Sequence, residues 1–294
     1  MPTPLKQYSP LDVMLSRPAA AHFPQHPRRF LAQGDSWFSF GSVNPLATGN
    51  LMDGMAFDVD SCVVNCAHPG DVLNHMVDKR REPMFANLLL GAQAWRWDAI
   101  LLSPGGNDLI DFIRVPSHDA DGQPVPPFLR ALLTPDERGG DPPLAASYVS
   151  EQGWDTFVQH IVPQFHEFVA MRDAASSQSA GVPIFVHTYD FITPRDAGAG
   201  AGAGPWLYPA LREYAVPQAV WIPLTRLFLA RLTALMRSMA LAQFHVIDTQ
   251  GTLDPADLGS QGNDHDWANE IHPNPGGYRK LGAVFAQGIE ALMP

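Results

Sequence analysis

The sequence predicts an α/β fold in which a parallel sheet is covered by helices on both faces. Two observations lead to this prediction. Short apolar runs alternate with longer segments of helical periodicity along most of the chain. The apolar runs are continuous rather than alternating, which is typical of strands buried on both faces. Right-handed crossovers would then place successive strands parallel to one another in one sheet.

Five apolar runs are the predicted strands, and segments with apolar residues at helical spacing lie between and after them. The strands are residues 29–33, 61–67, 99–103, 183–187 and 244–248. The helices are one beginning at Asp71, whose carboxylate is placed to cap it, and residues 84–94, 151–173, 222–242 and 276–292. The chain is therefore expected to alternate strand and helix throughout.

The domain organisation follows from where the regular pattern is interrupted. Residues 1–28 are rich in proline, alanine and histidine and are predicted to form an irregular N-terminal arm. Residues 29–294 show no internal repeat and no interdomain linker, so we expect a single domain. Two stretches rich in Pro, Gly, Ala or Asp, near 114–146 and 195–221, are predicted to be insertions.

Composition restricts the partners of the chain. It has 294 residues, of which 46% are hydrophobic and 17% charged, and its formal net charge is −11. This negative charge argues against nucleic acid or an anionic membrane as the main partner. No apolar run approaches the roughly 20 residues of a membrane helix, and the N-terminus lacks a basic segment followed by an apolar core. We expect a cytoplasmic protein without an integral membrane segment, and its oligomeric state is left open.

The two cysteines lie in the same predicted strand. Cys62 and Cys66 are expected to be reduced core thiols rather than a disulfide or a metal pair, because no further ligands follow at matching spacing. No metal or cofactor is therefore expected.

Three residues that could take part in catalysis follow the ends of three different predicted strands. They are Ser36, Gly70 and Asn107. Open parallel sheets bind ligands beyond the carboxyl ends of their strands, so these residues are expected to meet at one edge. Ser36 stands in Gly34-Asp35-Ser36-Trp37, where a tight bend can expose its hydroxyl and Asp35 can brace the turn.

This set of residues fits acyl transfer by a serine. Such a reaction needs a hydroxyl nucleophile, a base and hydrogen-bond donors for the oxyanion. Ser36 supplies the hydroxyl, and His272, in a loop just before the last helix, is the best placed of eleven histidines to act as the base. The backbone N–H groups of Ser36 and Gly70 and the amide of Asn107 are the candidate donors.

At this point the residues resemble a known family. Gly34-Asp35-Ser36, Gly70, Gly105-Gly106-Asn107-Asp108 and His272 resemble the four blocks of the SGNH (GDSL-type) hydrolases, from about residue 29 to the C-terminus. The resemblance implies a flavodoxin-like three-layer α/β/α sandwich with a parallel five-stranded sheet, the SGNH hydrolase fold. It also implies a metal-independent serine esterase that cleaves a small-molecule carboxylic ester, thioester or acetyl ester. Ser36 would be the nucleophile, His272 the base, and Ser36, Gly70 and Asn107 the oxyanion hole.

The sequence departs from the family pattern beside the base and beside the nucleophile. The family usually has an aspartate three residues before the histidine, and here that residue is Asn269. We expect Asn269 or a backbone carbonyl to orient His272, with Asp266 as the next candidate and Glu270 after it. Trp37 replaces the usual leucine and is expected to pack in the core or to line the acyl pocket.

Candidate substrate-binding residues and two rival functions complete the predictions. The substrate-binding candidates are Asp35, Trp37, Tyr189 and Trp206. The first rival is a metal-dependent phosphoesterase, whose ligands would be Asp35, Asn107, Asp108, His187 and His272. The second is a non-catalytic ligand-binding protein on the same fold, suggested by the missing aspartate.

Overall fold

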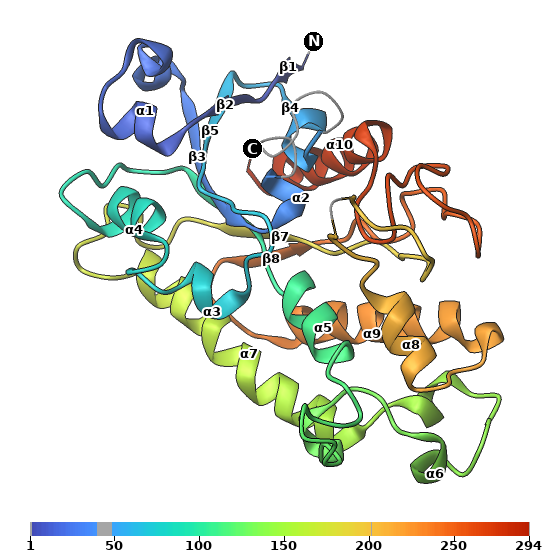
Figure 1. Ribbon diagram of the computed structural model, residues 1–294. Helices are drawn as coiled ribbons and strands as arrows, with labels where there is room; N and C mark the ends of the chain where they lie inside the picture. The colour runs from blue at the N-terminus through green and yellow to red at the C-terminus, as the bar shows by residue number, and fades with distance from the viewer. Residues whose placement is uncertain (1, 40–48, 201, 294) are drawn as a thin grey trace.

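The protein is built on a six-stranded parallel sheet, seen in a computed structural model that describes residues 2–39, 49–200 and 202–293 (Figure 1). The strand order is β2-β5-β3-β6-β7-β8. The strands are β2 (Lys6–Tyr8), β3 (Arg28–Gly34), β5 (Ser61–Asn65), β6 (Ala99–Ser103), β7 (Ile184–His187) and β8 (Phe244–Ile247). All neighbouring pairs run parallel. The predicted α/β class and all five predicted strands are confirmed.

The order of the five predicted strands is that of flavodoxin. Counted along the chain from β3, the order across the sheet is 2-1-3-4-5. The chain leaves β3 toward β5 on one side and later returns to β6 on the other. The carboxyl ends of β3 and β6 therefore border the crevice where such sheets bind ligands.

The N-terminal segment is the main difference from the prediction. Residues 1–28 were expected to be irregular, but β2 adds a sixth strand beside β5, and β1 (Thr3–Pro4) pairs antiparallel with β4 (Ala56–Phe57). Only Tyr8 of β2 is buried, and Lys6 is exposed. A three-residue edge strand of this kind has no local apolar pattern, because its pairing partner supplies most of its stability.

Helices cover both faces of the sheet (Figure 1). They are α1 (Pro10–Met14), α2 (Ser36–Ser39), α3 (Leu73–Met76), α4 (Pro83–Leu90), α5 (Gly106–Ile113), α6 (Pro135–Arg138), α7 (Glu151–Arg172), α8 (Leu207–Glu213), α9 (Gln218–Ser238) and α10 (Pro275–Leu292). Single 3-10 turns are η1 (Pro18–Ala20), η2 (Phe23–Gln25), η4 (Leu51–Gly54), η5 (Pro127–Leu129) and η6 (Ala145–Tyr148). α2 and α10 lie on one side of the sheet, and α4, α7 and α9 on the other. The result is a three-layer sandwich.

The predicted helix starting at Asp71 is shorter and begins later. α3 starts at Leu73, and its N-cap residue Val72 makes no side-chain cap. The Asp108 carboxylate, from the start of α5, instead accepts the N–H of Leu73 at 3.0 Å. The prediction that Asp71 caps this helix was wrong because the cap comes from a residue 35 positions away.

The longest apolar helix near the site is α9. Its length and composition would suffice to cross a membrane, although no such run was expected from the sequence. Half of its most apolar window is buried inside the fold, where it packs on β8 and η6. These contacts are those of a core helix, and α9 also forms part of the pocket described below.

The two insertions are packed against each other. The side chain of Arg138, in the first insertion, is fully buried. Its guanidinium donates to the carbonyl of Leu133 at 2.8 Å and to the carbonyls of Tyr214 and Ala215, in the second insertion, at 2.9 and 2.8 Å.

Cys62 and Cys66 are free and buried, and burial raises the pKa of the Cys62 thiol to about 12.

Candidate active site

The turn after β3 holds Ser36 at the first residue of α2. Gly34 is required there because a Cβ at this position would lie 2.6 Å from the Cβ of Ser103 on the neighbouring strand β6. The close approach of the two strands is fixed by the N–H of Asp35, which donates to the carbonyl of Ser103 at 3.2 Å. Ser36 is thereby placed at the edge between β3 and β6, and only 6% of its surface is exposed.

His272 lies directly against Ser36. Its Nε2 is 2.9 Å from the hydroxyl oxygen of Ser36, although the two residues are 236 positions apart. Its Nδ1 is 3.0 Å from the side-chain oxygen of Asn269. Because an amide oxygen only accepts hydrogen bonds, Nδ1 carries the proton and Nε2 is free to accept the proton of Ser36.

Asn269 also shapes the loop that carries the histidine. Its side-chain oxygen accepts the backbone N–H groups of Ile271 at 3.1 Å and of His272 at 2.9 Å. Among the groups considered for orienting His272, Asn269 is therefore the one that contacts the imidazole ring. The Asp266 carboxylate lies elsewhere, since it accepts the backbone N–H of Asp254 at 2.8 Å and the ammonium of Lys280 at 2.6 Å.

Glu270 does not face His272 either. Its side chain instead connects two segments of the chain, which the sequence did not predict. Its buried carboxylate accepts four backbone N–H groups, from Arg195, Trp206, Leu207 and Tyr208. Burial raises its pKa to about 7, although these hydrogen bonds act in the opposite direction. Glu270 thus holds the second insertion against the loop of His272. The ring of Trp206 packs edge-on against the imidazole, with centroids 5.2 Å apart.

The candidate oxyanion donors come from three turns at the same sheet edge. The side-chain amide of Asn107 donates to the carbonyl of Asp71 at 2.9 Å, which ties α5 to the loop containing Gly70. Gly70 has φ of +81°, a conformation that favours glycine. Among the described residues, neither the N–H of Ser36 nor that of Gly70 has a hydrogen-bond acceptor. Ser36 and Asn107 line one pocket.

This pocket is an apolar cavity that opens beside Ser36. Its volume is about 30 Å³. Trp37 and Tyr189 line it, as expected from the sequence, together with Asp35. The residues that line the rest of it are Gly106, Leu109, Ile110, Ile113, Ile192, Leu207, Thr225, Phe228, Leu229 and Ile271. Sequence reasoning missed these because pocket-lining and core aliphatic residues have the same local pattern.

Asp35 lies behind Ser36 and links three strand ends. Its carboxylate accepts the N–H of Trp37 at 3.0 Å and lies 2.8 Å from the Ser103 hydroxyl and 2.5 Å from the Tyr189 hydroxyl. Burial raises the pKa of this carboxyl. Trp37 stacks on His187 with ring centroids 5.5 Å apart. Asp35, Trp37 and Tyr189 therefore form the floor of the pocket.

The residues proposed as ligands for a phosphoesterase metal are not gathered together. Asp108 binds the backbone of Leu73, and His187 binds Ser103. In the described part of the chain, two other groups of His, Asp and Glu have ligand atoms within 4.8 Å of one another: His68, Asp71 and Glu82, and Asp257, Asp264 and His265.

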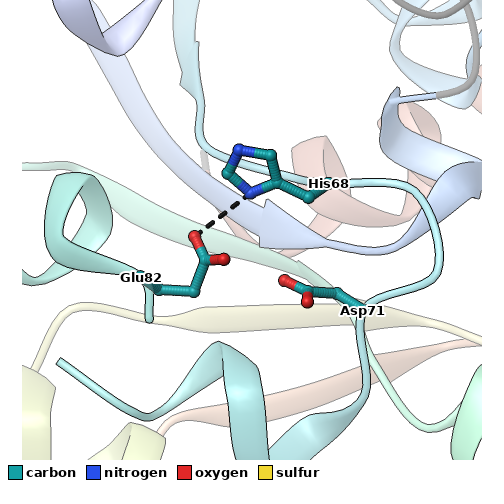
Figure 2. A group of neighbouring side chains, drawn as sticks. All are labelled: His68, Asp71 and Glu82. Carbon is teal, nitrogen blue, oxygen red and sulfur yellow. Dashed lines mark ion pairs between the residues drawn. The ribbon is translucent and has the colours of Figure 1, made fainter. Parts of the chain in front are cut away.

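The first of these groups, shown in Figure 2, includes His68 and Asp71, which lie on either side of Gly70 in the sequence. His68 Nδ1 is 3.2 Å from the Glu82 carboxylate, and the Asp71 carboxylate points toward that of Glu82. Burial and the nearby Glu82 raise the pKa of Asp71. One nitrogen and two carboxylate oxygens are a suitable ligand set for a divalent cation. None of the three touches Ser36 or His272, so this group is separate from the nucleophile and its base.

No family model and no curated protein matches the sequence. Solved structures resemble the chain in fold. They include a protein from Slackia heliotrinireducens assigned to the SGNH hydrolases (12% identity, TM-score 0.42, 89% of this chain and 98% of that one). A lipase from a goat rumen metagenome (13%, 0.46, 90% and 96%) and an aryl esterase of M. smegmatis (14%, 0.44, 90% and 99%) are also similar. At such low similarity, we argue function from the side chains of this chain alone.

Burial lowers the pKa of His272 to about 3, and this has a consequence for stability. In the unfolded chain a histidine titrates near pH 6.5. Between these values the unfolded state binds more protons, so the contribution of His272 is complete above about pH 6.5 and is lost as the pH falls toward 3.

We therefore predict that acid destabilises the wild type more than His272→Gln. On going from pH 7 to pH 5, the free energy of unfolding should fall by about 2 kcal/mol more in the wild type than in the variant. Urea unfolding at both pH values measures this difference. Equal losses in the two proteins would show that the imidazole is not held neutral by burial.

Proposed function

We propose that the protein is a serine esterase of the SGNH type. The observation that carries this proposal is the position of His272, whose two ring nitrogens lie 2.9 Å from Ser36 and 3.0 Å from Asn269. A serine hydroxyl, an imidazole and an orienting acceptor in one line is the arrangement that activates a serine for attack on a carbonyl.

The reaction follows from these contacts. Ser36 Oγ attacks the ester carbonyl carbon while its proton moves to Nε2 of His272. The N–H groups of Ser36 and Gly70 and the amide of Asn107 donate to the oxyanion. As the intermediate collapses, the alcohol leaves with the proton held by His272, and Ser36 remains acylated. A water molecule then gives a proton to His272 and attacks the acyl carbon, which releases the acid and restores Ser36.

The cavity beside Ser36 suggests the class of ester. It is lined mostly by aliphatic and aromatic side chains, and Asp35 is the one acidic or basic residue among the described residues that line it. From Asn107 to Ile113 the helix α5 runs along it for about 9 Å at the usual helical rise. We therefore assign this cavity to an apolar acyl group rather than to a charged or sugar acid.

The first prediction concerns the nucleophile. Ser36→Ala should lower kcat/KM for a p-nitrophenyl ester by roughly 10⁴-fold or more, and a chelator should leave the wild type unchanged. Ser61→Ala, a buried serine at the start of β5, is the control and should retain activity. Turnover that survives Ser36→Ala, or that the chelator removes, would favour the metal phosphoesterase. Ligand binding without turnover would favour a binding protein.

The second prediction concerns Asn269, the third residue of the proposed triad with Ser36 and His272. Asn269→Asp places a negative charge on His272 Nδ1, which stabilises the imidazolium and raises the pKa of His272. We expect kcat/KM to rise about tenfold or more, with the roughly 10⁴-fold effect of the reverse change in a serine triad as the upper bound. The acid limb of the pH–rate profile should move to higher pH. An unchanged limb in Asn269→Asp would mean that residue 269 does not act through the imidazole.

The third prediction concerns the acyl pocket. Ile113→Trp fills its far end, so kcat/KM for an octanoate ester should fall about tenfold or more while that for the acetate ester changes little. Asp111→Asn, at an exposed position of the same helix, is the control. Equal losses on both esters would place the acyl chain elsewhere.

A further inference from the structure

Three buried side chains form a continuous chain of short contacts behind Ser36. His187 Nε2 lies 2.8 Å from the Ser103 hydroxyl oxygen, and that oxygen lies 2.8 Å from Asp35 Oδ1. Ser103 and His187 have no exposed surface, and Asp35 is 2% exposed. Each of these contacts therefore needs a hydrogen atom from the side chains themselves.

Counting the hydrogens shows how many protons this chain holds. Nδ1 of His187 lies 3.1 Å from the carbonyl oxygen of Thr188, which only accepts, so Nδ1 must carry a proton. Ser103 has a single hydroxyl proton for its two contacts at 2.8 Å and for a longer third contact, to the Tyr189 hydroxyl at 3.2 Å. The Tyr189 hydroxyl is already directed at Asp35 Oδ2 at 2.5 Å.

With Asp35 ionised and His187 neutral, one contact lacks its hydrogen. If Ser103 donates to Asp35, the lone pairs of Ser103 and His187 Nε2 face each other at 2.8 Å. If Ser103 donates to His187, its oxygen faces a carboxylate oxygen at the same distance. One more proton removes either conflict, because it sits on Asp35 Oδ1 or on His187 Nε2 and supplies a hydrogen to both contacts at 2.8 Å.

We infer that Asp35, Ser103 and His187 share one additional proton, so that this chain of side chains is electrically neutral behind Ser36. The two placements interconvert when Asp35 gives its proton to Ser103 while Ser103 gives its own to His187. Burial raises the pKa of Asp35 to about 6 and lowers that of His187 to about 4. Of the two placements of the shared proton, these shifts favour the one on Asp35.

The role of this neutrality rests on the proposed function. The N–H of Ser36, next to Asp35 in sequence, is a donor to the developing oxyanion. An ionised carboxylate this close, in a site of low dielectric, would repel that negative charge and raise the barrier. Asp35, Ser103 and His187 are thus positioning residues that act through Ser36 by keeping charge away from the oxyanion.

Other titratable groups lie near Asp35, and their protonation states affect its charge. Tyr189 and Tyr278 have a pKa raised well above its usual value by burial, so they remain neutral. The carboxyls of Asp71 and Asp108 also lie within electrostatic range of Asp35. An ionised Asp35 raises the pKa of both carboxyls, and a neutral Asp35 removes this repulsion.

The proton is best observed directly, in the full-length protein at pH 7. Carbon-13 labelling of aspartate carboxyls and nitrogen-15 labelling of histidine rings identify the protonated groups by NMR, with Asp35→Asn and His187→Gln used to assign the signals. We expect a protonated Asp35 with neutral His187, and an ionised Asp35 with a doubly protonated His187 supports the same sharing. An ionised Asp35 together with a neutral His187 would overturn the inference. This result does not depend on whether the protein hydrolyses esters.

Ser103→Ala tests the effect on the reaction. It breaks the link, so Asp35 ionises at pH 8 and kcat/KM should fall about tenfold or more. At pH 5, where Asp35 is protonated without the link, the activity should approach that of the wild type. Ser61→Ala is the control. A loss of the same size at both pH values would show a merely structural role for Ser103 and contradict the electrostatic one.

Discussion

The Asp35 carboxylate is the contact on which the site depends. It joins the end of β3 to Ser103 at the end of β6 and to Tyr189 just after β7, and it also holds the N–H of Trp37. Three neighbouring parallel strands are thus fixed to one another where their chains leave the sheet. Gly34 makes this possible, because a side chain at that position would push β3 away from β6. The position of Ser36, one residue after this junction, follows from it.

His272 is brought to Ser36 by contacts of a different kind. The loop that carries it is folded by the side chain of Asn269, and Arg195 donates to the carbonyl of Asn269 at 2.8 Å. Glu270 fastens the same loop to the start of α8. An amide orients the ring as an aspartate would but adds no charge. Burial lowers the pKa of His272, which keeps the imidazole neutral near pH 7.

The sequence predicted the parts of this structure that have a local or motif-level signal. The continuous apolar runs predicted β3, β5, β6, β7 and β8. Ser36 and Asn107, chosen because they follow strand ends, line one pocket, and the roles of Ser36, Gly70 and Asn107 stay predictions. The choice of His272 from eleven histidines came from the resemblance as much as from its loop. The features that were missed depend on contacts between residues far apart in the sequence. β2 is stabilised by pairing with β5, and Asp108 caps a helix 35 residues away. Glu270 binds backbone N–H groups rather than His272. The apolar wall of the pocket was hidden because its residues have the pattern of an ordinary core.

The proposed function requires that Ser36 attack the carbonyl and carry the acyl group. Its most direct test is to mix the protein with a p-nitrophenyl ester, quench in acid within the first turnover, and map the acylated peptide by mass spectrometry. We expect one acyl group on Ser36. We also expect a larger amount of this acylated protein in a His272 variant whose deacylation is slowed more than its acylation. Acylation at another residue, or hydrolysis with no covalent adduct at any quench time, would contradict it.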